Sequence, residues 1–229
     1  MILELSPLFI SLQTAAAATA AAFFPGILAA RWLAHTPPGK GKALADGLLI
    51  MPLLLPPTVI GFLLLLIFGN RGLLGRTLSE WGLPIVFTWP GAVIAAAVVT
   101  FPLMYRTARG AFEQVDPDML DAARTMGDTE WRLFWRILLP LSWPGITSGI
   151  ILSFARALGE FGATLMLAGN IPGKTQTMPI AIYFAVEGGK RDVALVWTLI
   201  MIAVATTIVL SLNYWSDRRQ NFAGRHKGK

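Results

Sequence analysis

The stretch D-A-A-R-T-M-G-D-T-E-W-R-L-F-W-R-I-L-L-P runs from Asp121 to Pro140. It is a charged, amphipathic island between long apolar segments. A polar connector in a membrane protein usually needs only to be short and soluble, but this one is patterned as two small helices hinged at Gly127. The pattern is typical of a surface that another protein grips, so it indicates a membrane subunit driven from outside by a partner.

The first of these helices has recognisable start and stop signals. At Asp116–Asp118, proline suits the first turn and acidic residues favour the positive end of a helix. Gly127 readily takes the left-handed conformation that a helix terminus needs. The sequence therefore predicts a short helix over Met119–Met126.

The second helix is predicted to begin after a cap at Asp128 and to end at Pro140. Between them lies an apolar stripe at i, i+3, i+4 and i+7, opposite two arginines. The stripe consists of Trp131, Phe134, Trp135 and Leu138. The two helices lie flat against the membrane or against a partner, and amphipathicity alone favours plain interfacial helices.

The composition indicates a helical membrane protein. Apolar residues make up 55% of the 229 positions, charged residues 14%, and the mean hydropathy is +0.60. Soluble domains carry about 25% charged residues, and a hydrocarbon core takes roughly 20 helical residues to cross. We predict an all-α polytopic fold of about five crossings within one domain, residues 1–229, because uncharged runs this long fit helices rather than barrel strands. They are Ser6–Ala30, Gly47–Asn70, Trp81–Tyr105, Ile137–Ala155 and Val193–Ser216.

The distribution of Lys and Arg predicts the orientation, because cytoplasmic connectors carry the excess. With the N-terminus outside and the C-terminus cytoplasmic, thirteen lie inside and five outside. The net charge of +6 is therefore mostly a topology signal, and we expect no nucleic-acid partner. The inner residues are Arg31, Lys40, Lys42, Arg106, Arg109, Arg124, Arg132, Arg136, Arg218, Arg219, Arg225, Lys227 and Lys229; the outer ones are Arg71, Arg76, Lys174, Lys190 and Arg191.

Two interruptions of the apolar pattern are candidate pathway elements. Phe161–Gly173 and Thr175–Val186 are each too short to cross alone, which suits re-entrant or gating segments. A plain hairpin at the outer surface is the alternative. Pro52, Pro56 and Pro57 predict a kink in the second crossing, which either lies along the pathway or serves packing only.

Arg156 and Glu160 lie at i and i+4 in or near the outer half of the fourth crossing, so we expect them to pair. Ionisable groups at membrane depth usually face the protein interior or a water-filled path. They either attract an anion or hold a gate together with Phe161 and Gly162, or form a structural ion pair. The structural role is favoured, because a tight anion site in the pathway would slow release.

Other chemistry has little support. The sequence has no cysteine, and its two histidines, His35 and His226, do not form a metal-ligand or catalytic arrangement. Ala168–Thr175 resembles a phosphate loop, but Pro179 follows where a helix interior would lose a hydrogen bond. We expect no enzyme, metal site or cofactor in this chain.

The island resembles the cytoplasmic motif of ABC importer permeases. The spacing [D/E]-A-A-x3-G-x9-I-x-L-P is met at fixed positions on the predicted inner side, although the family often has Glu where this chain has Asp. The resemblance implies that residues 118–139 form coupling helices seated in a groove of an ATPase subunit, within a type I importer permease fold. The residues concerned are Asp121, Ala122, Ala123, Met126, Gly127, Ile137, Leu139 and Pro140.

Three further segments resemble the molybdate permeases, namely residues 52–61, 154–164 and 169–175. Sulfate permeases are the nearest competitor, but they tend to carry Tyr and Ser where this chain has Phe161 and Ala163. The resemblance implies an oxyanion importer subunit of the cytoplasmic (inner) membrane, with molybdate favoured over tungstate or sulfate.

The same resemblance implies the rest of the assembly. We expect two copies of this chain in the bilayer, two cytoplasmic ATPase subunits that bind ATP, and an outer molybdate-binding protein, periplasmic or extracellular. The alternative is a stand-alone channel or secondary transporter, which would need ionisable relays deep in several helices.

Overall fold

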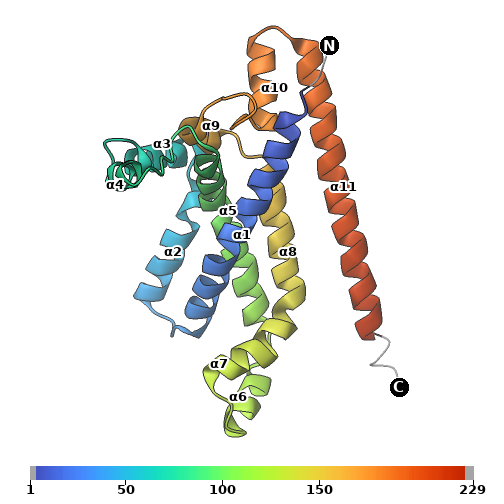
Figure 1. Ribbon diagram of the computed structural model, residues 1–229. Helices are drawn as coiled ribbons and strands as arrows, with labels where there is room; N and C mark the ends of the chain where they lie inside the picture. The colour runs from blue at the N-terminus through green and yellow to red at the C-terminus, as the bar shows by residue number, and fades with distance from the viewer. Residues whose placement is uncertain (1–3, 225–229) are drawn as a thin grey trace. The chain divides into compact units, whose positions relative to one another are not determined.

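The computed structural model describes residues 4–224, and it describes their side chains except those of residues 209 and 211–224. Every regular element in this part is helical (Figure 1). The chain divides into two compact units, one ending at Thr177 and the other beginning at Met178. The basic side chains of the tail that entered the orientation count lie outside the described residues; they are Arg218, Arg219, Arg225, Lys227 and Lys229.

The first unit is organised around α5 (Trp89–Glu113), which packs against α1 (Ser6–His35) and α8 (Leu139–Leu158). Small residues bring these helices together. A Cβ on Gly26 of α1 would lie 2.9 Å from Met104 Cγ, and one on Gly145 of α8 would lie 2.5 Å from Ala111 Cβ. Helices in a membrane associate through such close approaches, because lipid provides no hydrophobic drive between them.

The second predicted crossing is not one helix. It consists of α2 (Lys40–Leu54) and α3 (Pro57–Phe68), which are bent by 107°. Leu55 is extended because a residue before proline avoids the α region, and Pro57 starts the new helix in its first turn. The prediction of a kink is confirmed, whereas a continuous helix through Gly47–Asn70 is wrong.

Two short helices complete the first unit beside the elbow described below. α4 (Gly75–Glu80) follows α3, and α9 (Gly162–Ala168) packs on α3 and α5. An apolar cluster joins α3, α5 and α9. It consists of Ile60 and Leu64 from α3, Ala95 and Val99 from α5, and Ala163 and Leu167 from α9.

The second unit is a helical hairpin of α10 (Met178–Glu187) and α11 (Arg191–Gly224). Gly189 has φ +70°, and the amide of Lys190 donates to the carbonyl of Ala185 at 2.8 Å. The left-handed glycine thereby terminates α10. As expected, α9 and α10 are separate half-length helices.

Counted by length and composition within residues 4–224, four helices are long and apolar enough to cross a membrane, and the bent α2–α3 pair makes a fifth. The prediction of about five crossings is confirmed. One crossing is longer than predicted, because α7 (Glu130–Leu133), the π-helical turn η1 (Phe134–Leu138) and α8 run on without a break.

Candidate functional site

The island forms an elbow of two helices beyond the ends of α5 and α8 (Figure 1). Its first helix, α6, runs from Pro117 to Thr125, and the side chain of Asp116 accepts a hydrogen bond from the amide of Asp118 at 3.0 Å. Both the helix and its acidic, proline-containing start were predicted.

The end of α6 is a Schellman motif built around Gly127. The Gly127 amide donates to the carbonyl of Arg124 at 3.0 Å, and the Asp128 amide donates to that of Ala123 at 3.2 Å. Gly127 has φ +89°, and a Cβ there would meet no atom within 4 Å. The requirement for glycine is therefore conformational rather than steric, as predicted.

Arg124 forms ion pairs with carboxylates of both helices of the elbow. Its guanidinium lies 2.7 Å from the Glu130 carboxylate and 2.6 Å from that of Asp121. These two partners raise the pKa of Arg124 above its usual range, with Glu130 contributing most. Asp121, the acidic residue of the motif, thus holds Arg124 from within α6, and Arg124 connects α6 to Glu130 of α7.

The cap of the second helix differs from the prediction. Thr129, and not Asp128, precedes the helix, and its hydroxyl accepts from the amide of Arg132 at 3.4 Å. The extended backbone of Thr129 places its side chain over the first turn, as an N-cap requires. Asp128 instead lies 3.5 Å from the Arg132 guanidinium.

The predicted stop at Pro140 is also wrong. The helix continues through η1, where the amide of Leu139 donates to the carbonyl of Phe134. Proline lacks the donor of an α-helical bond and its ring crowds the preceding turn. The wider π turn directly before Pro140 takes up this mismatch without ending the helix.

Half of the predicted apolar stripe is buried in the core and half is exposed. Phe134 and Leu138 are 3% and 1% exposed and belong to the core cluster with α1 and α5. Trp131 and Trp135 are 60% and 50% exposed. Within the stripe, the i, i+4 pair of Phe134 and Leu138 faces the core and the i, i+4 pair of Trp131 and Trp135 faces outward, so the two tryptophans remain available for a partner.

The motif residues fall into two groups by burial. Ala123 is buried, and Ile137 and Leu139 pack partly buried against the core. The exposed residues of the motif are Asp121, Ala122, Met126, Gly127 and Pro140.

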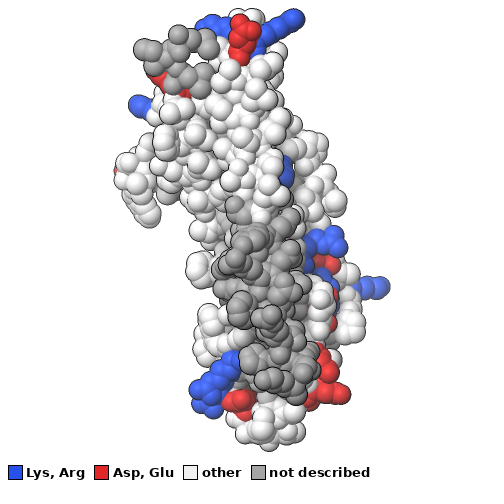
Figure 2. All heavy atoms as spheres, turned by 90° about the vertical axis from the view of Figure 1, so that its right-hand side faces the viewer, with Lys and Arg blue, Asp and Glu red and all other residues white. Residues whose placement is uncertain are grey.

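Charged side chains gather on the elbow. In the face shown in Figure 2, acidic and basic side chains cluster at the lower end, at the height of α6 and α7 in Figure 1. The ion pairs of Arg124 and Arg132 belong to this end. Exposed charges beside exposed tryptophans suit a protein contact better than burial in lipid.

The second predicted group is held at the corner between α8 and α9. Arg156 Nη1 lies 2.7 Å from Glu160 Oε2, which confirms the expected pair. The other carboxylate oxygen accepts a hydrogen bond from the amide of Ala163 at 2.9 Å. Glu160 is 2% exposed and thus joins α8 to the first turn of α9, an arrangement that favours a structural role.

Close packing brings the break between α2 and α3, at Pro56 and Pro57, next to the corner between α8 and α9. A Cβ on Gly162 would lie 3.2 Å from Pro57 Cβ, and one on Gly61 would lie 2.8 Å from the Cα of Ala163. The structure therefore places Pro56, Pro57, Phe161 and Gly162 in one region, although they are distant in sequence.

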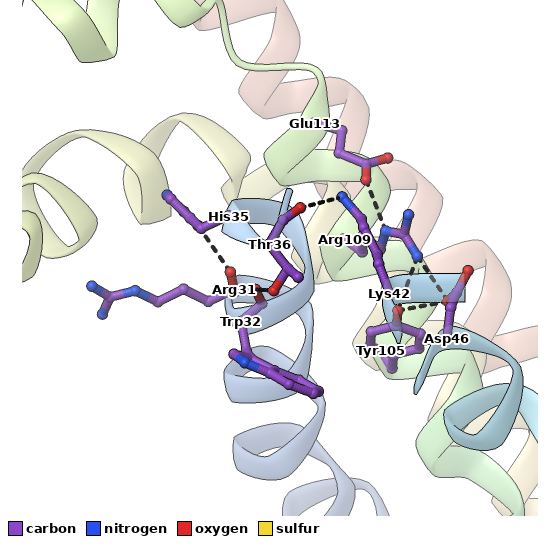
Figure 3. Close-up of polar contacts among 9 residues, drawn as sticks. All are labelled: Arg31, Trp32, His35, Thr36, Lys42, Asp46, Tyr105, Arg109 and Glu113. Carbon is purple, nitrogen blue, oxygen red and sulfur yellow. Dashed lines mark hydrogen bonds and ion pairs between the residues drawn. The ribbon is translucent and has the colours of Figure 1, made fainter. Parts of the chain in front are cut away.

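Sequence reasoning missed a polar network between α2 and α5 (Figure 3). The Asp46 carboxylate lies 2.7 Å from Arg109 Nη1 and accepts a hydrogen bond from the Tyr105 hydroxyl at 2.7 Å. Arg109 also pairs with Glu113 at 2.8 Å. The i, i+4 spacing within α5 was a usable signal, whereas Asp46 is far away in sequence.

Among the described residues, no group of three or more His, Asp or Glu side chains is placed to hold a metal ion. The arrangement is that of helices crossing a membrane with an elbow suited to a partner protein.

Comparisons with known proteins agree with this arrangement. The sequence profile described as "Binding-protein-dependent transport system inner membrane component" matches residues 24–222. The molybdenum transport system permease protein ModB of Escherichia coli is 47% identical over 191 residues, 82% of this chain and 82% of that protein. The sulfate transport system permease protein CysW of Synechocystis sp. is 33% identical over 201 residues, 87% of this chain and 71% of that protein.

Among solved structures, a bacterial ABC transporter involved in the import of the acidic polysaccharide alginate matches with a TM-score of 0.77. The match covers 93% of this chain and 79% of that chain at 19% identity. At this identity the likeness concerns the fold alone, and it confirms the predicted type I importer permease fold.

Proposed function

Because the chain belongs to the family of binding-protein-dependent transport system inner membrane components, we propose that it is the membrane permease subunit of an ATP-driven molybdate importer. The assignment of molybdate as the substrate rests on the 47% identity to a molybdenum permease, compared with 33% identity to a sulfate permease. Import into the cell follows from the family, whose members work with a substrate-binding protein and an ATPase.

The elbow is the proposed site of coupling. Its bend is fixed by Gly127 and by the bridge from Arg124 to Asp121 and Glu130, while Met126 and two tryptophans stay exposed at its surface. A partner that grips this surface could tilt α8 directly, because α7, η1 and α8 form one continuous helix. Rigid-body rocking of helices would then open the pathway to alternate sides.

The assembly we propose has two copies of this chain, two ATPase subunits and one outer binding protein. Five crossings with one elbow make half of a symmetric pathway, and closed two-fold dimers are the commonest assembly. The elbow would face the cytoplasm, with the N-terminus outside, as the excess of Lys and Arg predicts. Anion recognition would rest chiefly with the binding protein.

The test is uptake of labelled molybdate into proteoliposomes that hold this chain, its ATPase and its binding protein, with ATP inside. We expect ATP-dependent uptake that excess tungstate blocks and excess sulfate does not. Block by sulfate would move the substrate to the sulfate branch. Uptake by this chain without the ATPase would identify a channel or secondary transporter instead.

A further inference from the structure

Arg31, near the end of α1, reaches across to the second helix of the elbow. Its guanidinium carbon lies 4.4 Å from the ring centroid of Phe134 and 5.4 Å from that of Trp131. Its Nη2 donates a hydrogen bond to the backbone carbonyl of Glu130 at 3.2 Å. Figure 3 shows its side chain extending away from the network of Asp46 and Arg109.

The contact differs from the elbow's other arginine contacts. Arg124 and Arg132 pair with carboxylates inside the elbow, whereas Arg31 comes from another helix and has no ion pair among the described side chains. A planar guanidinium can lie on aromatic faces and donate at its edge, which an ammonium group cannot reproduce. The geometry therefore selects arginine by shape, beyond its charge.

The contact lies at the first turn of the helix that continues into α8. The α-helical part of the second helix is 4 residues long, with Gly127 on one side and the 5-residue π turn on the other. The helix continues through the π turn into α8, and the left-handed Gly127 and the π turn are the two departures from α-helical geometry beside the contact. An open cavity of about 630 Å³, lined by Trp32, His35 and Arg124 among others, adjoins the contact, so apolar packing does not fill this side.

We propose that Arg31 is a positioning residue that fixes the orientation of α7 against α1. Movement of the elbow is thereby passed to α1 as well as to α8, with which α7 is continuous. The coupling consequence rests on the proposed function, whereas the positioning itself does not.

The first experiment measures positioning alone. The chain has no cysteine, so spin labels can be placed through Leu28→Cys on α1 and Arg132→Cys on α7 in the full chain in nanodiscs. We expect one narrow distance distribution with Arg31, and a broad one with Arg31→Ala or Arg31→Lys. The control, Lys40→Ala, removes a positive charge from the same end without touching the elbow. Equal distributions in all variants would overturn the proposal, whatever the complex transports.

The second experiment measures coupling in the reconstituted complex as molybdate moved per ATP hydrolysed. Arg31→Lys is expected to lower this ratio about three- to tenfold, the size that loss of a cation–π contact allows, while ATPase co-purification is retained. With Phe134→Leu, the added Arg31→Lys change is expected to have little further effect. An unchanged ratio in Arg31→Lys, alongside a reduced ratio in Arg31→Ala, would mean that charge suffices and would overturn the positioning role.

Discussion

The carboxylate of Asp46 lies 2.7 Å from the guanidinium of Arg109, and this ion pair connects α2 to α5. α2 has no buried residue and is bent sharply away from α3. The side chains of Asp46 and Arg109 are 30% and 20% exposed. This partly buried ion pair therefore helps to hold α2 against α5, because side-chain packing alone holds α2 weakly.

Asp46→Asn should therefore destabilise the protein. The substitution keeps the shape but leaves Arg109 and the Tyr105 hydroxyl with a weaker acceptor, at a cost of about 1–2 kcal/mol. The measurement is the midpoint of thermal unfolding in detergent. Glu80→Gln is the matched control, because it removes an ion pair whose side chains are 79% and 61% exposed and contributes little. Equal midpoints for both variants would contradict the role of Asp46.

Two substitutions of Glu160, at the corner between α8 and α9, test whether this residue has a structural role. Glu160→Gln keeps an acceptor for the Ala163 amide, whereas Glu160→Ala removes both contacts. If the residue is structural, the alanine variant should lose about 2 kcal/mol or more by leaving Arg156 and a buried amide unpaired, and the glutamine variant less. The loss is measured as the yield of assembled complex and the midpoint of thermal unfolding of each variant.

Arg156→Gln complements that experiment. We expect normal molybdate uptake in the fraction of complex that assembles, because the burial of Glu160 and its bond to the Ala163 amide favour a structural role for the pair. Loss of uptake with intact assembly and intact ATP hydrolysis would instead assign Arg156 to the anion pathway.

Gly61→Ala should disturb the packing of α3 on α9. The new Cβ would lie 2.7 Å from Met166 Cβ and 2.8 Å from Ala163 Cα, and overpacking of this kind costs about 1–3 kcal/mol. Gly47→Ala is the control, because a Cβ there meets nothing within 4 Å. In a helix that change should be neutral or stabilising by up to about 1 kcal/mol. Unfolding midpoints that shift in the same direction would argue against tight α3–α9 packing.

Gly127→Val should weaken binding of the ATPase subunit. Valine resists the positive φ, so the Schellman motif and the bend of the elbow would be strained by roughly 1–3 kcal/mol. Gly127→Asn should retain more binding, since asparagine tolerates the left-handed region. Co-purification of the ATPase is the measurement, and an unchanged yield with valine would refute the role of the bend.

Trp135→Asp tests the exposed face of the elbow. Trp135 is half exposed, so the change should leave the fold stable while removing apolar contact area from the partner. We expect at least about a tenfold loss of ATPase affinity, as for a central aromatic contact. Trp143→Asp on α8 is a comparison outside the elbow. Wild-type uptake with Trp135→Asp would show that this face is not a contact.

The sequence by itself determined the membrane class, the crossings and the position of the elbow. These features depend on local chemistry: run length against bilayer thickness, proline and acidic residues at the start of α6, and a glycine at its end. The pair of Arg156 and Glu160 was predictable for the same reason, because residues at i and i+4 lie close together on a helix, and here they still meet although Glu160 lies just past the end of α8.

Tertiary structure decided which surfaces remain available and which distant residues meet. Packing of the elbow against α1 and α5 buried Phe134 and left Trp135 half exposed, although both belong to the apolar stripe of the sequence. Arg31 reaches Glu130, and Asp46 reaches Arg109, only because α1, α2 and α5 pack as they do. Such contacts depend on the crossing of whole helices, and small residues such as Gly26 and Gly145 set how closely those helices approach.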